Sequence, residues 1–471
     1  MAAMGSSVVG VAVAVTACLC GAAWLALPHL VSHVLAMDHL GDSAGWQRLK
    51  IGAEMAGGGD EGALAMAEAI RAVAMARVLG PPASPARTAW HDLVGTLDSA
   101  ATEYLTPRRG FGLGPPRHGE HEIAEGFRYL SHVTRLALEL HVESSPRFVR
   151  FVSPTLKLIG DNPDALYFIA VVDPGRTYRV SGCRHGEVYL SIAVQGPSDG
   201  GAFQRVLVDV NDDHLAFDEA GCYAVVLSAN RPPGDLPEGT TWLELPPSAL
   251  TVITRHYYQA DPPAQLNREI QRQHELAIID LSPPPPPVAA TELDNVLAGR
   301  LAAAAAFVQA HTVAMPLPDP TTAPPFFSLR PNDIGPPTKW SRESEGMGAV
   351  DIAYGAGRFV LEPGEVLHIT GRMPRCRFAN VVLWNRYLQS FDYEAGKGAV
   401  SLNKGQITVD DDQRFTVLLA AADPRRANST AAYLWTEGRL TGTIFFRFVL
   451  PTEAVEKPIT RKMTFDEAHR L

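Results

Sequence analysis

Carboxylate, amide and phenol side chains gather at the entrance to the first strongly β-like segment of the chain. Asp161, Asn162, Asp164 and Tyr167 fall within seven positions of one another. The oxygen atoms of such a group could orient a sugar hydroxyl or hold a hard cation. The structural alternative is a turn, in which Asp and Asn side chains accept hydrogen bonds from nearby backbone N–H groups. Because the EF-hand spacing is absent, we expect no metal here and keep both other hypotheses.

A second group of side chains could line one concave face of a sheet, where aromatic rings stack on sugars and guanidinium groups clamp carboxylates. Its members are Arg179, Trp242, Arg255, His256 and Tyr257. In the structural alternative, Arg255 forms an ion pair with Asp218. Its counterpart Arg447 would then pair with Asp410, since ion-pair networks are common in folded proteins.

A third cluster, His118-Gly119-Glu120-His121-Glu122, holds two imidazoles and two carboxylates that could seed a zinc or iron site. The zincin motif, however, needs two histidines four residues apart on one helix, and these are three apart. Glutamates favour the positive end of a helix dipole, so we expect a solvated first helical turn. For the whole chain we expect neither a metal nor a cofactor.

One β-rich unit is written twice in this chain. The matching segments are Val171–Gly175 with Val360–Gly364 and Tyr178–Gly182 with Leu367–Gly371 at an offset of 189, and Arg255 with Arg447 at an offset of 192. A shared offset over roughly 90 residues indicates two copies of one structural unit. His256 and Tyr258 have no polar counterparts in the second copy, so a single ligand site is expected in the first.

Short β-type runs between turn residues fill both copies, a pattern typical of an antiparallel jelly roll and not of a βαβ fold. Helical periodicity precedes the first copy, from Trp90 to Leu105 and from Glu120 to Val142. We expect this helical layer to pack on the first copy. Between the copies we expect helices over 264–279 and 289–312, separated by a stiff proline tract at 282–287.

The predicted fold class is therefore α+β, mainly β: two tandem jelly-roll-like antiparallel β-sandwich units with an N-terminal helical layer and a transmembrane helix. The predicted parts are a membrane anchor or signal segment (1–34), a helical region (40–155), the first β-sandwich (156–262), a helix and proline-rich linker (263–320), the second β-sandwich (321–455) and a charged surface tail (456–471).

An almost uninterrupted apolar run, Val8–Leu27, opens the chain. Twenty such residues rise about 30 Å as a helix, enough to cross a hydrocarbon core. No Lys or Arg precedes the run, so we expect an uncleaved single-pass anchor and an extracytoplasmic body; a signal peptide and a buried helix are the alternatives. Cys183 and Cys222 fall in one β unit and could pair, but we expect buried free thiols.

Several segments resemble bacterial proteins of domain-of-unknown-function family 1214, with features similar to its companion family 1254. These segments are Glu122–Leu130, Gly160–Tyr167, Tyr178–Gly182 and the closing Gly442–Phe448. The resemblance covers roughly residues 93–451 and implies a jelly-roll-like β architecture with helical additions. It supplies no established activity, and the apolar N-terminal run and the proline tract depart from the plainest members.

The net charge of −10 argues against a nucleic-acid surface, which needs clustered Lys and Arg. The chain also lacks a nucleophile elbow, a Walker loop, a dinucleotide fingerprint and paired Cys-x-x-Cys ligands. We expect a membrane-anchored cell-envelope protein that binds a glycan, a lipid-linked ligand or another hydroxylated ligand through its first β unit. The alternatives are a lyase, hydrolase or isomerase acting on a sugar-like or lipid-linked substrate, and a structural assembly module.

Overall fold

The computed structural model describes residues 84–105, 120–144, 148–153, 157–198, 204–315, 320–321, 323–344, 346, 348–393 and 398–471. The chain divides into two units between Thr88 and Ala89, and the fold below is that of the second, Ala89–Leu471. Across the described residues, none of the helices combines the length and the apolarity that a bilayer crossing requires. The predicted membrane span, Val8–Leu27, lies outside the described residues.

The first half of this unit is built from two four-stranded sheets. Its strands are β1 (Ala165–Val171), β2 (Tyr178–Cys183), β3 (Tyr189–Pro197), β4 (Gln204–Asn211), β5 (Cys222–Ser228), β6 (Thr240–Glu244), β7 (Thr251–Tyr257) and β8 (Leu276–Asp280). One sheet has the order β1-β7-β3-β4 and the other the order β6-β5-β2-β8. Alternate residues of β3, Leu190, Ile192 and Val194, point between the two sheets and meet Val180 and Val225 in one core.

The second half repeats this plan. Its strands are β9 (Phe327–Ser328), β10 (Thr338–Lys339), β11 (Ile352–Val360), β12 (Glu365–Arg372), β13 (Phe378–Trp384), β14 (Ser401–Asn403), β15 (Arg414–Ala420), β16 (Ala432–Trp435), β17 (Thr441–Val449) and β18 (Ile459–Thr464). The order β11-β17-β13-β14 matches β1-β7-β3-β4, and β16-β15-β12-β18 matches β6-β5-β2-β8. The fold is thus mainly β, with mostly antiparallel sheets and some helices, as predicted.

The pairing register is also the same in the two halves. Val180 lies opposite Val225, and Ile369 lies opposite Val417. In the other sheet Ser191 pairs with Arg255 as Asn380 pairs with Arg447. These are the residues that the sequence offsets of 189 and 192 match, so the repeat found in the sequence is a repeat of structure.

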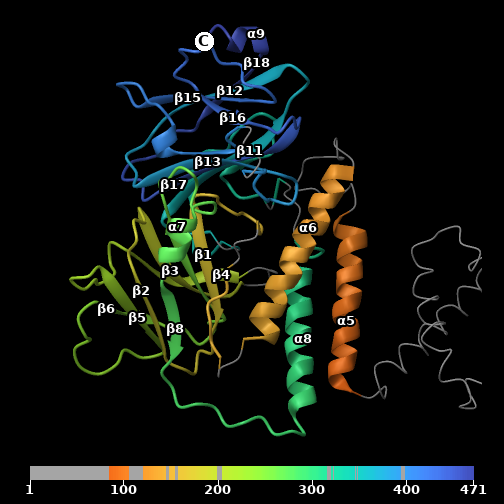
Figure 1. The fold of residues 1–471 in the computed structure, drawn as a ribbon, viewed down its shortest axis with the longest axis vertical. Coiled ribbons are helices and arrows are strands. Elements are labelled where there is room, and N and C mark those ends of the chain that lie inside the picture. Colours follow the sequence, from red (N-terminus) through yellow and green to blue (C-terminus); the bar gives the residue numbers. More distant parts are fainter. Residues whose placement is uncertain are drawn as a thin grey trace, which may run out of the picture. The chain divides into compact units, whose positions relative to one another are not determined.

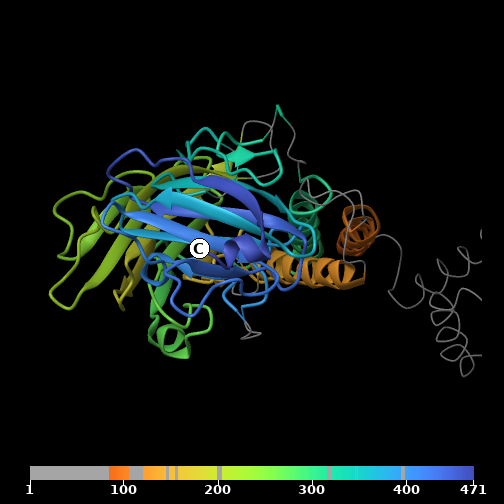
Figure 2. The ribbon, with the colours of Figure 1, turned by 90° about the horizontal axis from the view of Figure 1, so that it is seen from above.

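Helices cover one face of the first half. They are α5 (Pro85–Ser99), the π-helical turn η2 (Ala100–Tyr104), α6 (Glu120–Ala137), the π-helical turn η3 (Leu138–Val142) and α8 (Leu293–Ala310). Apolar residues of α6 and α8, among them Val133 and Val308, share a core with Ile169 and Ile253 of the sheet. Figures 1 and 2 show α6 and α8 together on one side of the strands. The predicted packing of a helical layer on the first copy is confirmed.

Two elements differ from the prediction. The segment predicted as helix over 264–279 forms a short helix, α7 (Arg268–Gln273), followed by strand β8, which pairs with β2. The predicted charged tail forms β18, which pairs with β12, and then the short helix α9 (Phe465–Ala468); the 3-10 turn η4 (Lys404–Gln406) lies elsewhere, directly after β14. In both halves the missed strand lies at a sheet edge and exposes alternate side chains, which weakens its apolar pattern.

The two halves meet through the outer faces of their sheets β1-β7-β3-β4 and β11-β17-β13-β14. Aromatic residues dominate this junction: Tyr189 and Tyr257 from the first half pack with Tyr354 and Phe378 from the second. The rings of Tyr257 and Phe378 lie edge to face, with centroids 5.4 Å apart. This junction decides the position of several of the predicted site residues.

Candidate functional site

The predicted cluster at the entrance to β1 is buried in the junction between the halves. Asp164 is only 1% exposed, and its carboxylate accepts hydrogen bonds from Asn380 Nδ2 at 2.8 Å and from Asn403 Nδ2 at 3.2 Å. Asn162 Oδ1 accepts a second hydrogen bond from Asn380, at 2.7 Å. Asp161 accepts hydrogen bonds from the backbone N–H and the hydroxyl of Ser390. These oxygens hold the second half against the first.

Burial raises the pKa of both carboxyl groups in this cluster. For Asp161 the nearby Lys157 ammonium and the hydrogen bonds from Ser390 oppose the rise, and for Asp164 the amides of Asn380 and Asn403 do so. Lys157 itself is buried and donates to the carbonyls of Ser390 and Phe391 at 3.0 and 2.8 Å.

An equivalent contact runs in the opposite direction across the same junction. Asp351 precedes β11 as Asp164 precedes β1, and its Oδ2 accepts from Asn211 Nδ2 at 3.0 Å. Asn211 ends β4 as Asn403 ends β14. Each half therefore has an aspartate that accepts a hydrogen bond from the asparagine at the end of a strand of the other half.

The remaining predicted residues occupy separate places. Tyr167 and Tyr257 lie in the junction with their hydroxyl oxygens 3.3 Å apart, and Arg255, 3% exposed, lies on the same outer sheet face. Arg179 is exposed on β2, in the other sheet of the sandwich, so it cannot line one concave face with Arg255. Trp242 lies half-buried on β6, where its indole N–H donates to Ser228 Oγ at 3.1 Å.

Arg255 and Arg447 are both buried, which agrees with the structural hypothesis, but the pairing that it predicted is a separate requirement; Asp410, the predicted partner of Arg447, accepts from backbone N–H groups of its own turn. Arg447 donates to the carbonyl of Gly160 at 2.9 Å and lies over the rings of Trp384 and Phe445. Asp218, the predicted partner of Arg255, accepts from backbone N–H groups within its own turn.

One side of the first turn of α6 is held by the second half, so the turn is only in part the solvated one that we predicted: His121 and Ile123 are exposed, but Glu122 is not. Glu122 is 6% exposed and forms an ion pair of 3.1 Å with buried Arg386. One turn later, Glu125 pairs with Arg439 at 2.6 Å, and Arg439 also lies 2.8 Å from His121 Nε2. His118 and Gly119 lie outside the described residues. The sequence pattern missed these partners because they are more than 260 positions away.

The prediction of free thiols at Cys183 and Cys222 is wrong. The two residues are directly opposite each other in the β2–β5 pair and form a disulfide. The sequence showed that they share one β unit; only the register shows that they are neighbours. Cys376 is free.

His256 belongs to a cluster inside the first sandwich that the sequence did not reveal as a whole. Its Nδ1 lies 3.2 Å from Glu187 Oε1, and His274 Nδ1 lies 3.9 Å from the same oxygen. Glu187 is in the turn before β3, His256 is on β7, and His274 ends α7. All three side chains are at most 4% exposed. Their sequence separation leaves no local motif.

The protonation of this cluster follows from its burial. Burial tends to raise the pKa of Glu187, but hydrogen bonds from His256 and from the backbone N–H of His185 outweigh it and lower the pKa to about 2. Burial lowers the pKa of His256, and burial together with His256 lowers the pKa of His274 to about 3. At neutral pH the cluster thus holds one carboxylate and two neutral imidazoles.

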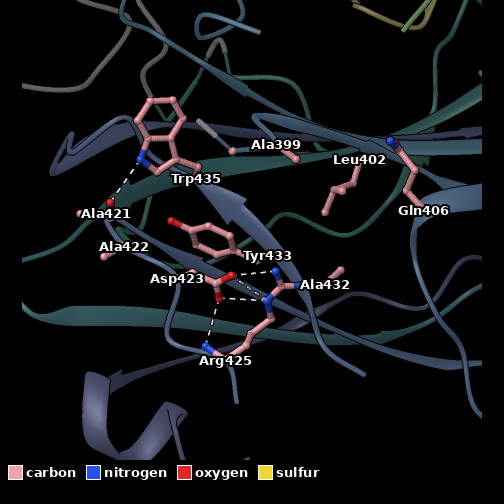
Figure 3. A pocket seen from close by; sticks show the side chains of 11 residues that line it. Ala399, Leu402, Gln406, Ala421, Ala422, Asp423, Arg425, Ala432, Tyr433 and Trp435 are labelled. Carbon is pink, nitrogen blue, oxygen red and sulfur yellow. Dashed lines mark hydrogen bonds and ion pairs between the residues drawn. The ribbon is translucent and has the colours of Figure 1, made fainter. Parts of the chain in front are cut away.

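A hollow of about 500 Å³ opens on the second half, beside strand β16 (Figure 3). Tyr433 and Trp435 of β16 lie on one side of it, and Leu402 and Gln406 lie across from them. Asp423 and Arg425, from the loop after β15, also line the hollow. No predicted site residue lines this hollow.

The polar groups of the hollow are positioned by their neighbours. Arg425 donates to Asp423 through Nε at 2.9 Å and Nη2 at 2.7 Å, a two-point contact that cancels their charges. The guanidinium also lies over the Tyr433 ring, at 5.5 Å from its centroid. Trp435 donates its indole N–H to the Ala421 carbonyl at 3.2 Å. The result is a neutral, hydrogen-bonding lining with aromatic surface.

The chain is similar to several solved structures, two of which show the extent of the likeness. One is an uncharacterised protein from Burkholderia cenocepacia, with 28% identity, a TM-score of 0.64, and coverage of 80% of this chain and 97% of that chain. The other is the VPA0106 protein from Vibrio parahaemolyticus, with 13% identity, a TM-score of 0.44, and coverage of 78% and 100%. No family model matches the chain, and no curated protein matches it. The Burkholderia likeness supports a shared fold and names no ligand.

Proposed function

We propose that this protein binds a neutral hydroxylated small molecule, such as a sugar, in the hollow of its second half. The observation that carries the proposal is the combination of an aromatic wall, Tyr433 and Trp435, with the charge-neutral pair Asp423–Arg425. A sugar ring has apolar C–H faces that pack on aromatic surface and hydroxyls that suit carboxylate and guanidinium groups. The size of the hollow is within the range of about 300–1,000 Å³ typical of ligand sites.

This proposal keeps the ligand class expected from the sequence and changes its place. Asp161 and Asp164, which the sequence suggested as ligand-binding residues, lie in the junction between the halves. There both carboxylates already accept hydrogen bonds from protein groups. The hollow on the second half instead opens to solvent beside an edge strand, which a ligand can reach without separating the halves.

We further propose a cell-envelope location, with the body of the chain outside the cytoplasm. The disulfide between Cys183 and Cys222 supports it, because such bonds persist in oxidising compartments. The apolar run Val8–Leu27 would act as the membrane anchor. In this proposal the two sandwiches are jelly-roll-like modules, of which the second carries the ligand.

The test is a binding screen of the full chain against neutral mono- and disaccharides and uronic acids, followed by calorimetric titration of the hits. Trp435→Ala should weaken binding by about two- to tenfold, because one stacked aromatic contact is worth about 0.5–1.5 kcal/mol. Trp242→Ala, which removes a half-buried tryptophan from the first half, is the matched control and should bind as the parent does. A screen without hits, or equal losses in both variants, would remove this site from consideration.

A further inference from the structure

The buried cluster of Glu187, His256 and His274 has the donor atoms and the spacing of a metal site. One ligand atom from each residue lies within 4.8 Å of the other two. Metal–ligand bonds of about 2.1 Å at tetrahedral angles would place the donor atoms about 3.4 Å apart. The distances from Glu187 Oε1 to the two imidazoles, 3.2 and 3.9 Å, lie on either side of that value.

Hydrogen bonds within the protein do not fully account for this cluster. Glu187 is a buried carboxylate with no Lys or Arg at ion-pair distance among the ion pairs of the described residues. The His274 side chain is only 4% exposed, so water does not readily reach its Nε2 atom. That atom has no hydrogen-bond partner in the described part of the chain. A buried carboxyl group with no Lys or Arg beside it is costly in its charged form, and a divalent ion would supply the missing positive charge.

Neighbouring groups hold the imidazoles in place. Phe168 stacks on the His274 ring, with centroids 4.6 Å apart, and its edge contacts His256. His256 Nε2 lies 3.0 Å from Thr254 Oγ1, so its Nδ1 faces Glu187. Support of this kind, which fixes the ring orientation from behind, is usual for metal-binding histidines.

The second half shows that the fold does not need polar groups here. At the repeat offset of 192, His256 corresponds to Phe448 and Tyr223 corresponds to Phe415, and both phenylalanines are buried in the apolar core of the second sandwich. At the offset of 189, Glu187 corresponds to Cys376. The same architecture is therefore stable with apolar packing, and the first half departs from it at the residues that could bind an ion.

We propose that Glu187, His256 and His274 bind one divalent transition-metal ion of the zinc or iron(II) class. Two imidazoles and one carboxylate suit these ions better than Ca²⁺ or Mg²⁺, which take mostly oxygen ligands. The Tyr258 hydroxyl lies 3.4 Å from His274 Nδ1, at the edge of the proposed site. The site is in the first half and is independent of the proposed sugar site in the second.

The experiment uses the full chain after removal of metals with a chelator, titrated with Zn²⁺ by calorimetry and with Co²⁺ by visible absorption. We expect one ion per chain and a melting temperature several degrees higher with metal, since a ligand of the native state stabilises it. His256→Phe copies the second half and should fold while binding Zn²⁺ at least about 100-fold more weakly. Glu187→Gln should show the same loss.

His311→Gln is the matched control, because it removes a buried imidazole outside the cluster and should leave the stoichiometry at one. Parent protein that binds no Zn²⁺, Fe²⁺, Mn²⁺ or Co²⁺, or that binds them as weakly as His256→Phe, would overturn the proposal. If the variants do not fold, X-ray absorption of the Zn²⁺-loaded parent decides the question. Two imidazole ligands with oxygen support the site, and sulfur ligands or a single imidazole refute it.

Discussion

Replacing Asp164 by alanine tests whether the cluster at the entrance to β1 is structural. The substitution removes the acceptor of one N–H from Asn380 and one from Asn403, and of the more distant Ser401 hydroxyl at 3.4 Å. Both amides keep another acceptor, Asn162 Oδ1 and the Ala260 carbonyl, so one buried donor per amide is left unsatisfied. Each costs about 1–3 kcal/mol, and removal of a buried carboxyl whose pKa is raised by burial offsets part of the sum. We expect a net loss of about 3 kcal/mol.

The assay is calorimetric melting of the full chain. With an unfolding entropy of about 2.1 cal/mol/K per residue over roughly 300 cooperatively unfolding residues, a loss of about 3 kcal/mol lowers the melting temperature by about 5 °C. Asp351→Ala breaks the reciprocal contact, losing Asn211 and the Tyr189 hydroxyl, and should lower it by a similar amount. Asp173→Ala, at an exposed turn, is the control and should lower it by only 1–2 °C, roughly, as for a single exposed hydrogen bond.

One combination of melting and binding results would refute the assignment of Asp164 to a structural role. If Asp164→Ala melts with the parent while its binding to a saccharide from the screen is lost, then Asp164 contacts ligand and the junction does not depend on it. Loss of stability with saccharide binding unchanged is the outcome that our assignment requires.

Three further predictions concern stability. Burial lowers the pKa of His311 to about 4 from an unfolded value near 6.5, so its contribution to stability is complete above pH 6.5 and is lost as pH falls toward 4. Between pH 7.5 and pH 4 the parent should therefore lose about 3 kcal/mol more stability than His311→Gln does, measured by melting. Replacing both Cys183 and Cys222 by serine removes a cross-link with a sequence separation of 39, and the free energy of unfolding should fall by at most roughly 4 kcal/mol. Melting measures this fall, and adding a reductant to the parent should reproduce it. Arg386→Met leaves the Glu122 carboxylate buried without its cation, so the free energy of unfolding should fall by about 3–5 kcal/mol. Proteolysis at the start of α6 should also become faster, and an unchanged rate of proteolysis would contradict the ion-pair argument.

Much of the β architecture could be predicted from the sequence because the repeat supplies its own evidence. Two copies with one offset predict equal registers, and the pairs Ser191–Arg255 and Asn380–Arg447 have that equality. The edge strands β8 and β18 could not be predicted in this way. Each is half exposed and follows or precedes helical residues, so pairing with β2 or β12, and not local preference, determines its conformation.

The candidate metal site was partly visible in the sequence. His256 stood out because its counterpart, Phe448, is apolar. Glu187 stood out less clearly, because its counterpart Cys376 is not fully apolar and both residues occur in turns, where polar side chains are common. His274 gave no signal, because it lies in a segment that resembles helix throughout and reaches the cluster only when β8 turns back to pair with β2.

The junction explains why function should be sought where the halves differ. Asp164 contacts Asn403, and the equivalent Asp351 contacts Asn211, which is the rule of a two-fold interface: residue i meets residue j, and j meets i. Duplication of a gene for a symmetric dimer would give this arrangement. Residues that obey the symmetry are needed to join two sandwiches, so their polarity requires no ligand. The histidine cluster and the hollow beside Trp435 do not join the two sandwiches. A polar cluster that is present in only one of two similar cores is therefore a stronger indication of binding than a polar contact that both halves make.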